Sequence, residues 1–240
     1  MSERLAKPFL TAEWRYLAML NFAANPALLQ PLVPAGTELD FHNGETFLSV
    51  VAFLFLNTRV LRMPIPFHRN FEEVNLRFYV RRKVDGEWRR GVCFVRELVP
   101  RFAIAFVARA FYGEPYSAVP MRHEVSHSAG QLAVNYAWRR GEVWESVAMS
   151  ANGAAEESAP GSHEEFITEH YWGYTARGDR SSEYQVKHPR WRVWPATTWK
   201  FDADVRSLYG SEFLAPVAAP PVSAFIADGS PVEVRKKSAA

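Results

Sequence analysis

The chain has one cysteine, few lysines and almost no net charge, and these shortages limit the bonds and the functions that the protein can have. Cys93 is the only cysteine among 240 residues, so no disulfide can form within the chain. It lies in the apolar run Gly91–Val95, where a buried structural thiol is expected rather than a nucleophile. The net charge is only +2, and basic residues are dispersed among acidic ones. This pattern argues against nucleic-acid binding.

Long apolar runs and export signals are also lacking. No uninterrupted apolar stretch approaches the roughly 18 residues that a membrane-spanning helix needs. The N-terminal segment, residues 1–8, lacks the apolar region and the small-residue cleavage site of a signal peptide. We therefore expect a cytoplasmic protein that does not associate with membranes.

The residues that are present predict a β-rich globular domain. An apolar fraction of 48% with 14% aromatic residues can supply a sizeable core. Repeats and an internal linker are missing, so we expect a single domain over residues 1–240, with a poorly structured tail from about residue 228. Alternating segments separated by turn residues predict an α+β fold of mostly antiparallel strands.

The expected elements follow from local patterns. Strands are predicted at residues 37–41, 47–56, 73–82, 88–99, 103–112, 122–128, 131–139, 143–149, 183–188 and 191–194, the first two as a hairpin. Asn25 as N-cap predicts a short helix from Pro26, and Ser162 with Glu165 forms a capping box for a helix reaching Gly173. Residues 9–22 and 201–213 fit either strand or helix, and residues 151–161 form the expected loop.

The predicted strand at 73–82 separates an apolar row from a polar one. Strand alternation sends Glu73, Asn75, Arg77 and Tyr79 to one face. An acid, an amide, a guanidinium and a phenol can together hold a small anionic or carbonyl ligand if that face lines a cavity. An ordinary solvated sheet face would have the same alternation.

Arg109 interrupts the apolar strand predicted at residues 103–112. An unpaired buried guanidinium is costly, so a carboxylate partner is expected, either Glu73 or Glu97 on neighbouring strands. An internal ion pair that fixes sheet register and an arginine that faces a ligand both fit this pattern.

Histidines and aromatic residues lie together in two segments. His170 is followed by Trp172 on the predicted helix, and His188 precedes Trp191 at a predicted strand. Histidine titrates near neutral pH and can serve in acid–base catalysis, although aromatic packing is the plainer role. His123 and His127 share a strand face, but no third ligand can be named, so we expect no metal site.

Several motifs together resemble a known bacterial family. They are Leu20-Asn21-Phe22, Asn25-Pro26-Ala27-Leu28-Leu29, the run from Pro64 to Arg77, Pro120-Met121-Arg122 and the run from Glu169 to Tyr174. Across residues 9–200 the chain resembles the YqjF-like domain of unknown function in the acetoacetate decarboxylase-like superfamily. This resemblance implies an antiparallel cone or barrel of strands around an internal pocket, and it favours the cavity interpretation of the Glu73 face.

The resemblance also implies a chemistry that this chain departs from. True decarboxylases form a Schiff base through a lysine that follows a Gly-x-Pro turn. The similar turn here, Gly113-Glu114-Pro115, is followed by Tyr116 and Ser117 instead of lysines. Lys200 is the least improbable substitute, and Glu73 corresponds to the acidic residue of the family's pocket.

These observations predict a pocket for a small organic acid or carbonyl compound, without a cofactor. The expected catalytic residues are Glu73, Tyr116 and His170, and the expected ligand-binding residues are Arg69, Asn75, Arg77, Arg109, Tyr112, Trp172, His188 and Trp191. A lyase, hydratase or isomerase without a catalytic lysine fits this set. A non-catalytic sensor or carrier, a Schiff-base decarboxylase with an unrecognised lysine, and an assembly partner that self-associates through its aromatic residues remain as alternatives.

Overall fold

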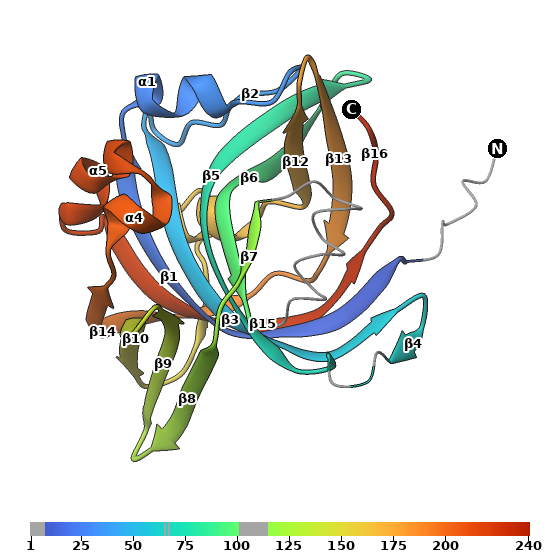
Figure 1. Ribbon diagram of the computed structural model, residues 1–240. Helices are drawn as coiled ribbons and strands as arrows, with labels where there is room; N and C mark the ends of the chain where they lie inside the picture. Colours follow the sequence, from blue (N-terminus) through green and yellow to red (C-terminus); the bar gives the residue numbers. More distant parts are fainter. Residues whose placement is uncertain (1–7, 65, 67, 101–114) are drawn as a thin grey trace.

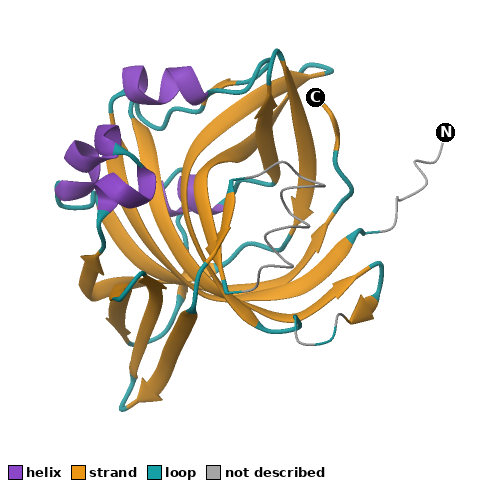
Figure 2. Ribbon diagram, viewed as in Figure 1, coloured by secondary structure: helices purple, strands orange, loops and turns teal. Residues whose placement is uncertain are grey.

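The computed structural model describes residues 8–64, 66, 68–100 and 115–240 (Figure 1). The predicted fold class is confirmed, because long strands, mostly antiparallel, dominate and the helices are few and short (Figure 2). The strands are β1 (Leu10–Ala24), β2 (Glu38–Leu39), β3 (Thr46–Val60), β4 (Met63–Pro64), β5 (Phe71–Val84), β6 (Glu87–Val99), β7 (Tyr116–Ala118), β8 (Met121–Ser128), β9 (Gln131–Arg140), β10 (Val143–Asn152), β11 (Glu156–Glu157), β12 (Trp172–Arg177), β13 (Arg180–Lys187), β14 (Arg192–Asp202), β15 (Ser223–Val234) and β16 (Ser238–Ala239). The helices include α1 (Pro26–Leu29), α3 (His163–Thr168), α4 (Val205–Tyr209) and α5 (Leu214–Ala218).

The long strands pair in a closed ring. Its order is β13, β12, β6, β5, β3, β1 and β15, and pairing of β13 with β15 completes the circle. Most neighbours are antiparallel, but β12 runs parallel to β6, and β7 runs parallel to the far end of β6. Closure leaves each ring strand with an inner face and an outer face, so alternate residues along one strand belong to two separate cores.

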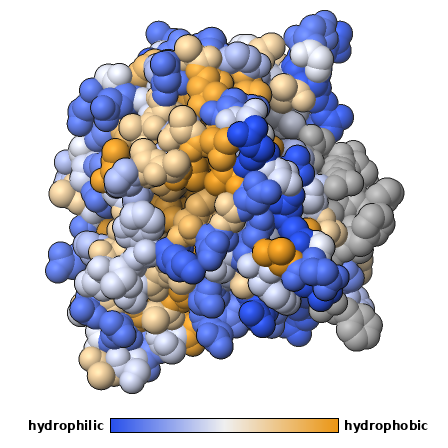
Figure 3. Space-filling view, turned by 60° about the vertical axis from the view of Figure 1, so that its left-hand side comes forward, coloured by the Kyte–Doolittle hydropathy of each residue, from blue (hydrophilic) through white to orange (hydrophobic). Residues whose placement is uncertain are grey.

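The outer face is covered by a second layer. β14 leaves the ring beside β15 and continues through β10, β9 and β8, and α4 and α5 pack nearby (Figure 1). Outward side chains of β5, such as Leu76 and Phe78, belong to the apolar cluster that includes Trp138 of β9. Figure 3 shows apolar residues gathered on the face that carries α4 and α5, where Ala215 and Val222 are exposed. Self-association of the chain stays a prediction.

The inner face carries its own apolar cluster. Val51 and Phe53 of β3 share it with Phe225 of β15 and with Phe166 and Ile167 of α3. α3 therefore packs against the end of the ring interior where β3 begins and β5 approaches its end. Burial of these large side chains is the main favourable term holding α3 in place, since a helix of six residues is not stable alone.

An irregularity in β1 bends the ring. Its register against β3 shifts between Arg15 and Ala18, and Tyr16 between them has a φ of 54°. Gly229 on β15 lies opposite Arg15 with a φ of 74°, and a Cβ there would lie 2.0 Å from the Trp14 carbonyl oxygen. A bulge of this kind increases local twist and curvature, which a closed ring requires.

Three sequence predictions about elements are wrong. The segment at 37–41 forms only the short β2, which pairs with β5 instead of making a hairpin with β3. β3 already has β1 and β5 on its two sides, so no edge is left for β2. The helix from the capping box ends at Thr168 rather than Gly173, because the chain turns there to enter β12.

The third correction concerns the C-terminal segment. Residues 223–234 form β15, which pairs with β1 over most of its length. Val232 and Val234 are buried in the inner cluster, so the expected tail from residue 228 is instead part of the ring. Among the described residues, no helix has the length and apolar character needed to span a bilayer.

Candidate functional site

The polar row of β5 lies on the inner face of the ring. Glu73, Asn75, Arg77 and Tyr79 are all buried, with exposed fractions of 3%, 2%, 9% and 1%. Their direct neighbours on β3 are Phe53, Val51 and Ser49, which also point inward. The alternative of an ordinary solvated sheet face is therefore wrong, because this row is enclosed by the ring.

Glu73 lies in a largely apolar part of this interior and has two hydrogen-bond donors. Asn75 Nδ2 donates to Oε1 at 3.0 Å, and the Tyr116 hydroxyl donates to Oε2 at 3.0 Å. Burial raises the pKa of Glu73 to about 7, although both hydrogen bonds and the positive charge of Arg77 oppose the rise. The carboxyl group is thus divided between its neutral and charged forms near neutral pH.

Arg77 is a buried cation with few hydrogen-bond partners among the described residues. Its Nη2 donates to the carbonyl oxygen of Ile167 in α3 at 3.4 Å, and its guanidinium carbon lies 5.6 Å from the centre of the Tyr79 ring. Among the described residues, none accepts a hydrogen bond from its Nε, and no carboxylate forms an ion pair with it. Buried charges in proteins are normally paired, so this guanidinium is suited to an anionic ligand.

His170 lies at the α3 end of the same interior. Its Nε2 lies 3.1 Å from Asp40 Oδ2, and Arg90 Nε donates to that same oxygen at 2.6 Å. Its ring packs on Tyr79, with 4.7 Å between ring centres. Burial lowers the pKa of His170 to about 4. For Asp40, burial opposes ionisation, but the contacts with His170 and Arg90 outweigh it and leave the pKa lowered.

A chain of polar side chains crosses the inner face from β5 to β15. The Tyr79 hydroxyl contacts Ser49 Oγ at 2.6 Å, Ser49 Oγ donates to Asn21 Oδ1 at 2.5 Å, and Asn21 Nδ2 donates to Ser223 Oγ at 2.8 Å. Because Ser49 gives its only proton to Asn21, Tyr79 is the donor in the first contact. This chain fixes the Tyr79 ring against which Arg77 and His170 rest.

Residues 11–231 match the model of the family DUF2071, described as an uncharacterized conserved protein. The chain belongs to the DUF2071 family. One relative is the uncharacterized protein YqjF of Bacillus subtilis (strain 168), which is 28% identical over 184 residues, covering 74% of this chain and 72% of the relative. The predicted resemblance is confirmed.

Solved structures share the fold of this DUF2071 chain. Acetoacetate decarboxylase from Legionella pneumophila aligns with a TM-score of 0.65 at 13% identity, over 98% of this chain and 88% of the other. The enduracididine biosynthesis enzyme MppR in complex with pyruvate gives 0.68 at 13% identity, over 99% and 92%. An acetoacetate decarboxylase-like enzyme from Sphingomonas wittichii RW1 gives 0.65 at 13%, over 98% and 94%. At these identities the likeness concerns the fold alone.

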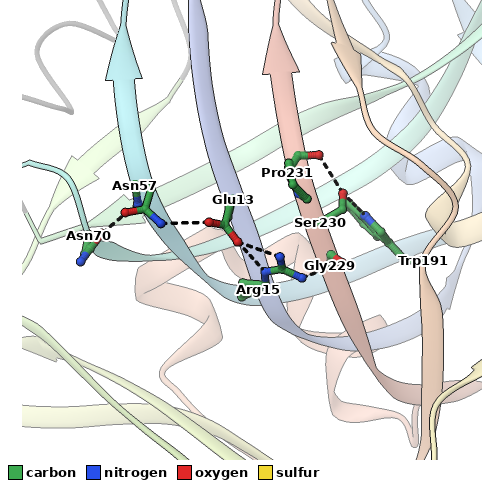
Figure 4. Close-up of polar contacts among 8 residues, drawn as sticks. All are labelled: Glu13, Arg15, Asn57, Asn70, Trp191, Gly229, Ser230 and Pro231. Carbon is green, nitrogen blue, oxygen red and sulfur yellow. Dashed lines mark hydrogen bonds and ion pairs between the residues drawn. The ribbon is translucent and has the colours of Figure 1, made fainter. Parts of the chain in front are cut away.

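Two further predicted residues of the DUF2071 chain lie beside the polar row. His188 follows β13 and stacks on Trp191, with ring centres 4.1 Å apart, and Trp191 Nε1 donates to Ser230 Oγ at 2.9 Å (Figure 4). Burial lowers the pKa of His188 to about 4, and the charge of Arg77 contributes to this. His188 is therefore neutral at physiological pH, and it lies close enough to Arg77 for that charge to lower its pKa.

Two predicted ligand-binding residues lie elsewhere. Arg69 is exposed and donates to Asn57 Oδ1 at 3.3 Å, next to the contact that Asn57 makes with Glu13 in Figure 4. Trp172 packs in the outer cluster, and its ring lies 4.4 Å from the guanidinium carbon of Arg89. Arg69 lies in the exposed segment before β5, and Trp172, at the start of β12, packs on the outer side, so neither faces the interior. Arg109 and Tyr112 lie outside the described residues.

The described lysines and His123 also lie away from the row. Lys200 is exposed on β14 and pairs with Asp202 at 2.9 Å, so it is not a substitute nucleophile in the interior. His123 instead contacts Glu72 at 2.6 Å on the outer side of β5. Cys93 is buried and donates to the Tyr174 carbonyl oxygen, as expected of a structural thiol. Within the described part of the chain, no three potential ligands are gathered to hold a metal ion.

Proposed function

We propose that the ring interior binds a small carboxylic acid with an adjacent carbonyl group and that Glu73 moves a proton on it. Arg77 holds the carboxylate, Glu73 exchanges the proton at the carbon next to the carbonyl, and Tyr116 supplies a proton to the carbonyl oxygen. This is lysine-independent lyase, hydratase or isomerase chemistry. A carrier or sensor would use the same binding without the proton transfer.

The buried Arg77 carries the proposal. Arg77 is 9% exposed, and its guanidinium, with one long hydrogen bond to Ile167, retains most of its donors for another group. A carboxylate matches this planar set of donors and neutralises the charge in a low-dielectric interior.

Glu73 supports the catalytic part of the proposal. An acid–base catalyst works best when its pKa lies near the working pH, and that of Glu73 is raised to about 7. In the proposed step, the carboxylate takes a proton from the carbon beside the carbonyl. The C–H electron pair becomes the carbon–carbon double bond of an enol, and the carbonyl oxygen receives a proton from Tyr116. Reversal of these transfers regenerates both groups.

The comparisons suggest the class of ligand. MppR, which shares the fold, is described in complex with pyruvate, a small acid with a carbonyl next to its carboxylate. Among the described lysines none is buried, so a Schiff base has no candidate amine in the described interior. Polarisation by hydrogen bonds and direct proton abstraction by a carboxylate remain as the chemistry for such a ligand.

Hydrogen–deuterium exchange tests the proposal. Pyruvate in heavy water is followed by NMR, and the protein is expected to accelerate loss of the methyl signal. Glu73→Gln should abolish the acceleration, while Arg77→Gln should raise the pyruvate concentration needed for it. Arg59→Gln, an exposed arginine on β3, serves as the matched control and should leave exchange unchanged. Exchange that persists in Glu73→Gln would overturn the catalytic role. Saturable binding without exchange would identify a carrier or sensor.

A further inference from the structure

His170 and Asp40 form a buried dyad at the α3 end of the interior, separate from the contacts of Glu73. Asp40 itself is fixed on the ring, since its backbone N–H donates to the Tyr79 carbonyl oxygen at 3.0 Å and Arg90 holds its carboxylate. The His170 side chain is 1% exposed and the Asp40 side chain 4%. Both side chains are therefore shielded from water, and their contacts within the protein determine where the proton between them lies.

The dyad selects one tautomer of His170. A charged carboxylate can only accept a hydrogen bond, so the proton of the neutral imidazole lies on Nε2 and points to Asp40. Nδ1 then bears a lone pair and is an acceptor. Nδ1 is buried, and no described residue donates a hydrogen bond to it.

The groups that face His170 set what can approach Nδ1. Phe166 and Tyr79 pack on the ring at 5.1 Å and 4.7 Å between ring centres. Asp40, Arg90 and Arg77 are the charged groups close enough to influence its pKa, and Arg77 rests on the same Tyr79 ring. The acceptor nitrogen of His170 and the unpaired guanidinium of Arg77 therefore belong to side chains that both pack on the Tyr79 ring in the interior.

We propose that Nδ1 of His170 accepts a hydrogen bond from a hydroxyl group of the bound acid, and that Asp40 is the positioning residue that makes Nδ1 the acceptor. The inference rests on the proposed function, because Arg77 supplies the anchor for the carboxylate. The ligands favoured are small hydroxy acids or the enol forms of oxo acids. This assignment replaces the expected role of His170 as a proton donor, which would require a proton on Nδ1 as well as on Nε2.

Binding of two matched acids tests the ligand part. Lactate and propionate differ by one hydroxyl group and are titrated calorimetrically. The wild-type protein is expected to bind lactate about tenfold more tightly than propionate, the value of one good hydrogen bond. His170→Phe, which keeps the aromatic packing, should remove this difference and leave propionate binding unchanged. His163→Phe alters another partly buried histidine that packs on Phe47 and should preserve the difference.

The outcomes separate the two proposals. Equal binding of both acids by the wild type, with loss of both in Arg77→Gln, would overturn the role of His170 and leave the carboxylate site intact. Binding that does not respond to Arg77→Gln, or no binding of either acid, would overturn the carboxylate site and this inference with it.

Nitrogen NMR tests the positioning role of Asp40 without a ligand. The chain has seven histidines, so the His170 signals are assigned by their loss in His170→Phe. The wild type should show a protonated Nε2 and an unprotonated Nδ1, and Asp40→Asn should give a mixture of both tautomers. Asp202→Asn, an exposed control, should change nothing. A protonated Nδ1 in the wild type would overturn the inference.

Discussion

The hydroxyl group of Tyr116 donates to Glu73 Oε2 at 3.0 Å and so connects β7 to β5 across β6. Glu73 comes from the strand that best displays alternation, whereas Tyr116 is the first residue of β7. The Tyr116 hydrogen bond opposes the rise that burial causes in the pKa of Glu73. The contact brings together the carboxyl group and the phenol that we propose for the proton transfer.

Removal of the phenol should make Glu73 harder to ionise. The Tyr116 hydrogen bond stabilises the charged carboxylate, so Tyr116→Phe is expected to raise the pKa of Glu73 above its value of about 7. Carbon NMR of the labelled carboxyl group measures this directly. Tyr171→Phe, whose hydroxyl contacts Glu169 instead, is the matched control. An unchanged or lower pKa in Tyr116→Phe would show that the hydroxyl does not donate to Glu73 in solution.

The raised pKa of Glu73 also predicts how stability changes with pH. The folded protein holds this proton more tightly than the unfolded chain, so its contribution to stability is fully present below about pH 4.5 and is lost as pH rises through about 7. The rise from 4.5 to about 7 corresponds to roughly 3 kcal/mol. Glu73→Gln should remove this loss, so that the variant gains stability relative to wild type between pH 5 and pH 8. Urea unfolding across this range is the measurement, and a constant difference between the two proteins would contradict the burial of Glu73.

The bend in β1 predicts an unusually costly glycine substitution. A Cβ at Gly229 would lie 2.0 Å from the Trp14 carbonyl oxygen, and the backbone there has a positive φ. Gly229→Ala should destabilise the fold by more than about 3 kcal/mol, because both backbone strain and a clash must be relieved. Gly178→Ala has a positive φ but open space around it, and should cost only about 1 kcal/mol. Thermal unfolding compares the two, and equal losses would show that the close approach of β1 and β15 is wrong.

The shortage of buried lysines predicts a negative chemical result. Sodium borohydride reduces a Schiff base to a stable amine, so incubation with acetoacetate and borohydride traps any lysine nucleophile as a protein adduct. No adduct is expected, since the described lysines all lie outside the interior. Mass spectrometry of the intact protein detects the adduct, and its appearance would restore the Schiff-base alternative.

Local patterns predicted the individual strands well and their partners less well. β5 and β6, both predicted as strands, are joined at Asp85 and Gly86, because both residues adopt the positive φ of a tight hairpin. Residues 42–45 do form a turn, but the predicted hairpin of 37–41 with 47–56 is wrong, since β3 takes long strands on both sides from distant parts of the sequence. The same limit explains β15, whose pairing with β1 joins opposite ends of the chain and leaves no local signal.

The site could be predicted only where one strand contained it. Strand alternation placed the four polar residues of β5 on one face, and closure of the ring made that face internal. These residues are Glu73, Asn75, Arg77 and Tyr79. Asp40 was missed, although a lone acid between Leu39 and Phe41 was a visible signal. Nothing local links residue 40 to His170, which lies 130 positions away. Arg69 is exposed before β5 and Trp172 packs in the outer cluster, so closeness in sequence to Glu73 and His170 does not place them in the site.

The central claim is that Arg77 is the carboxylate anchor of an enclosed site, and calorimetric titration with pyruvate tests it most directly. Wild-type protein and Arg59→Gln should bind with equal affinity. Arg77→Gln should bind at least about a hundredfold more weakly, because a charge-assisted pair in the interior is lost. Equal affinity of Arg77→Gln and wild type, in proteins that unfold at the same temperature, would contradict the account.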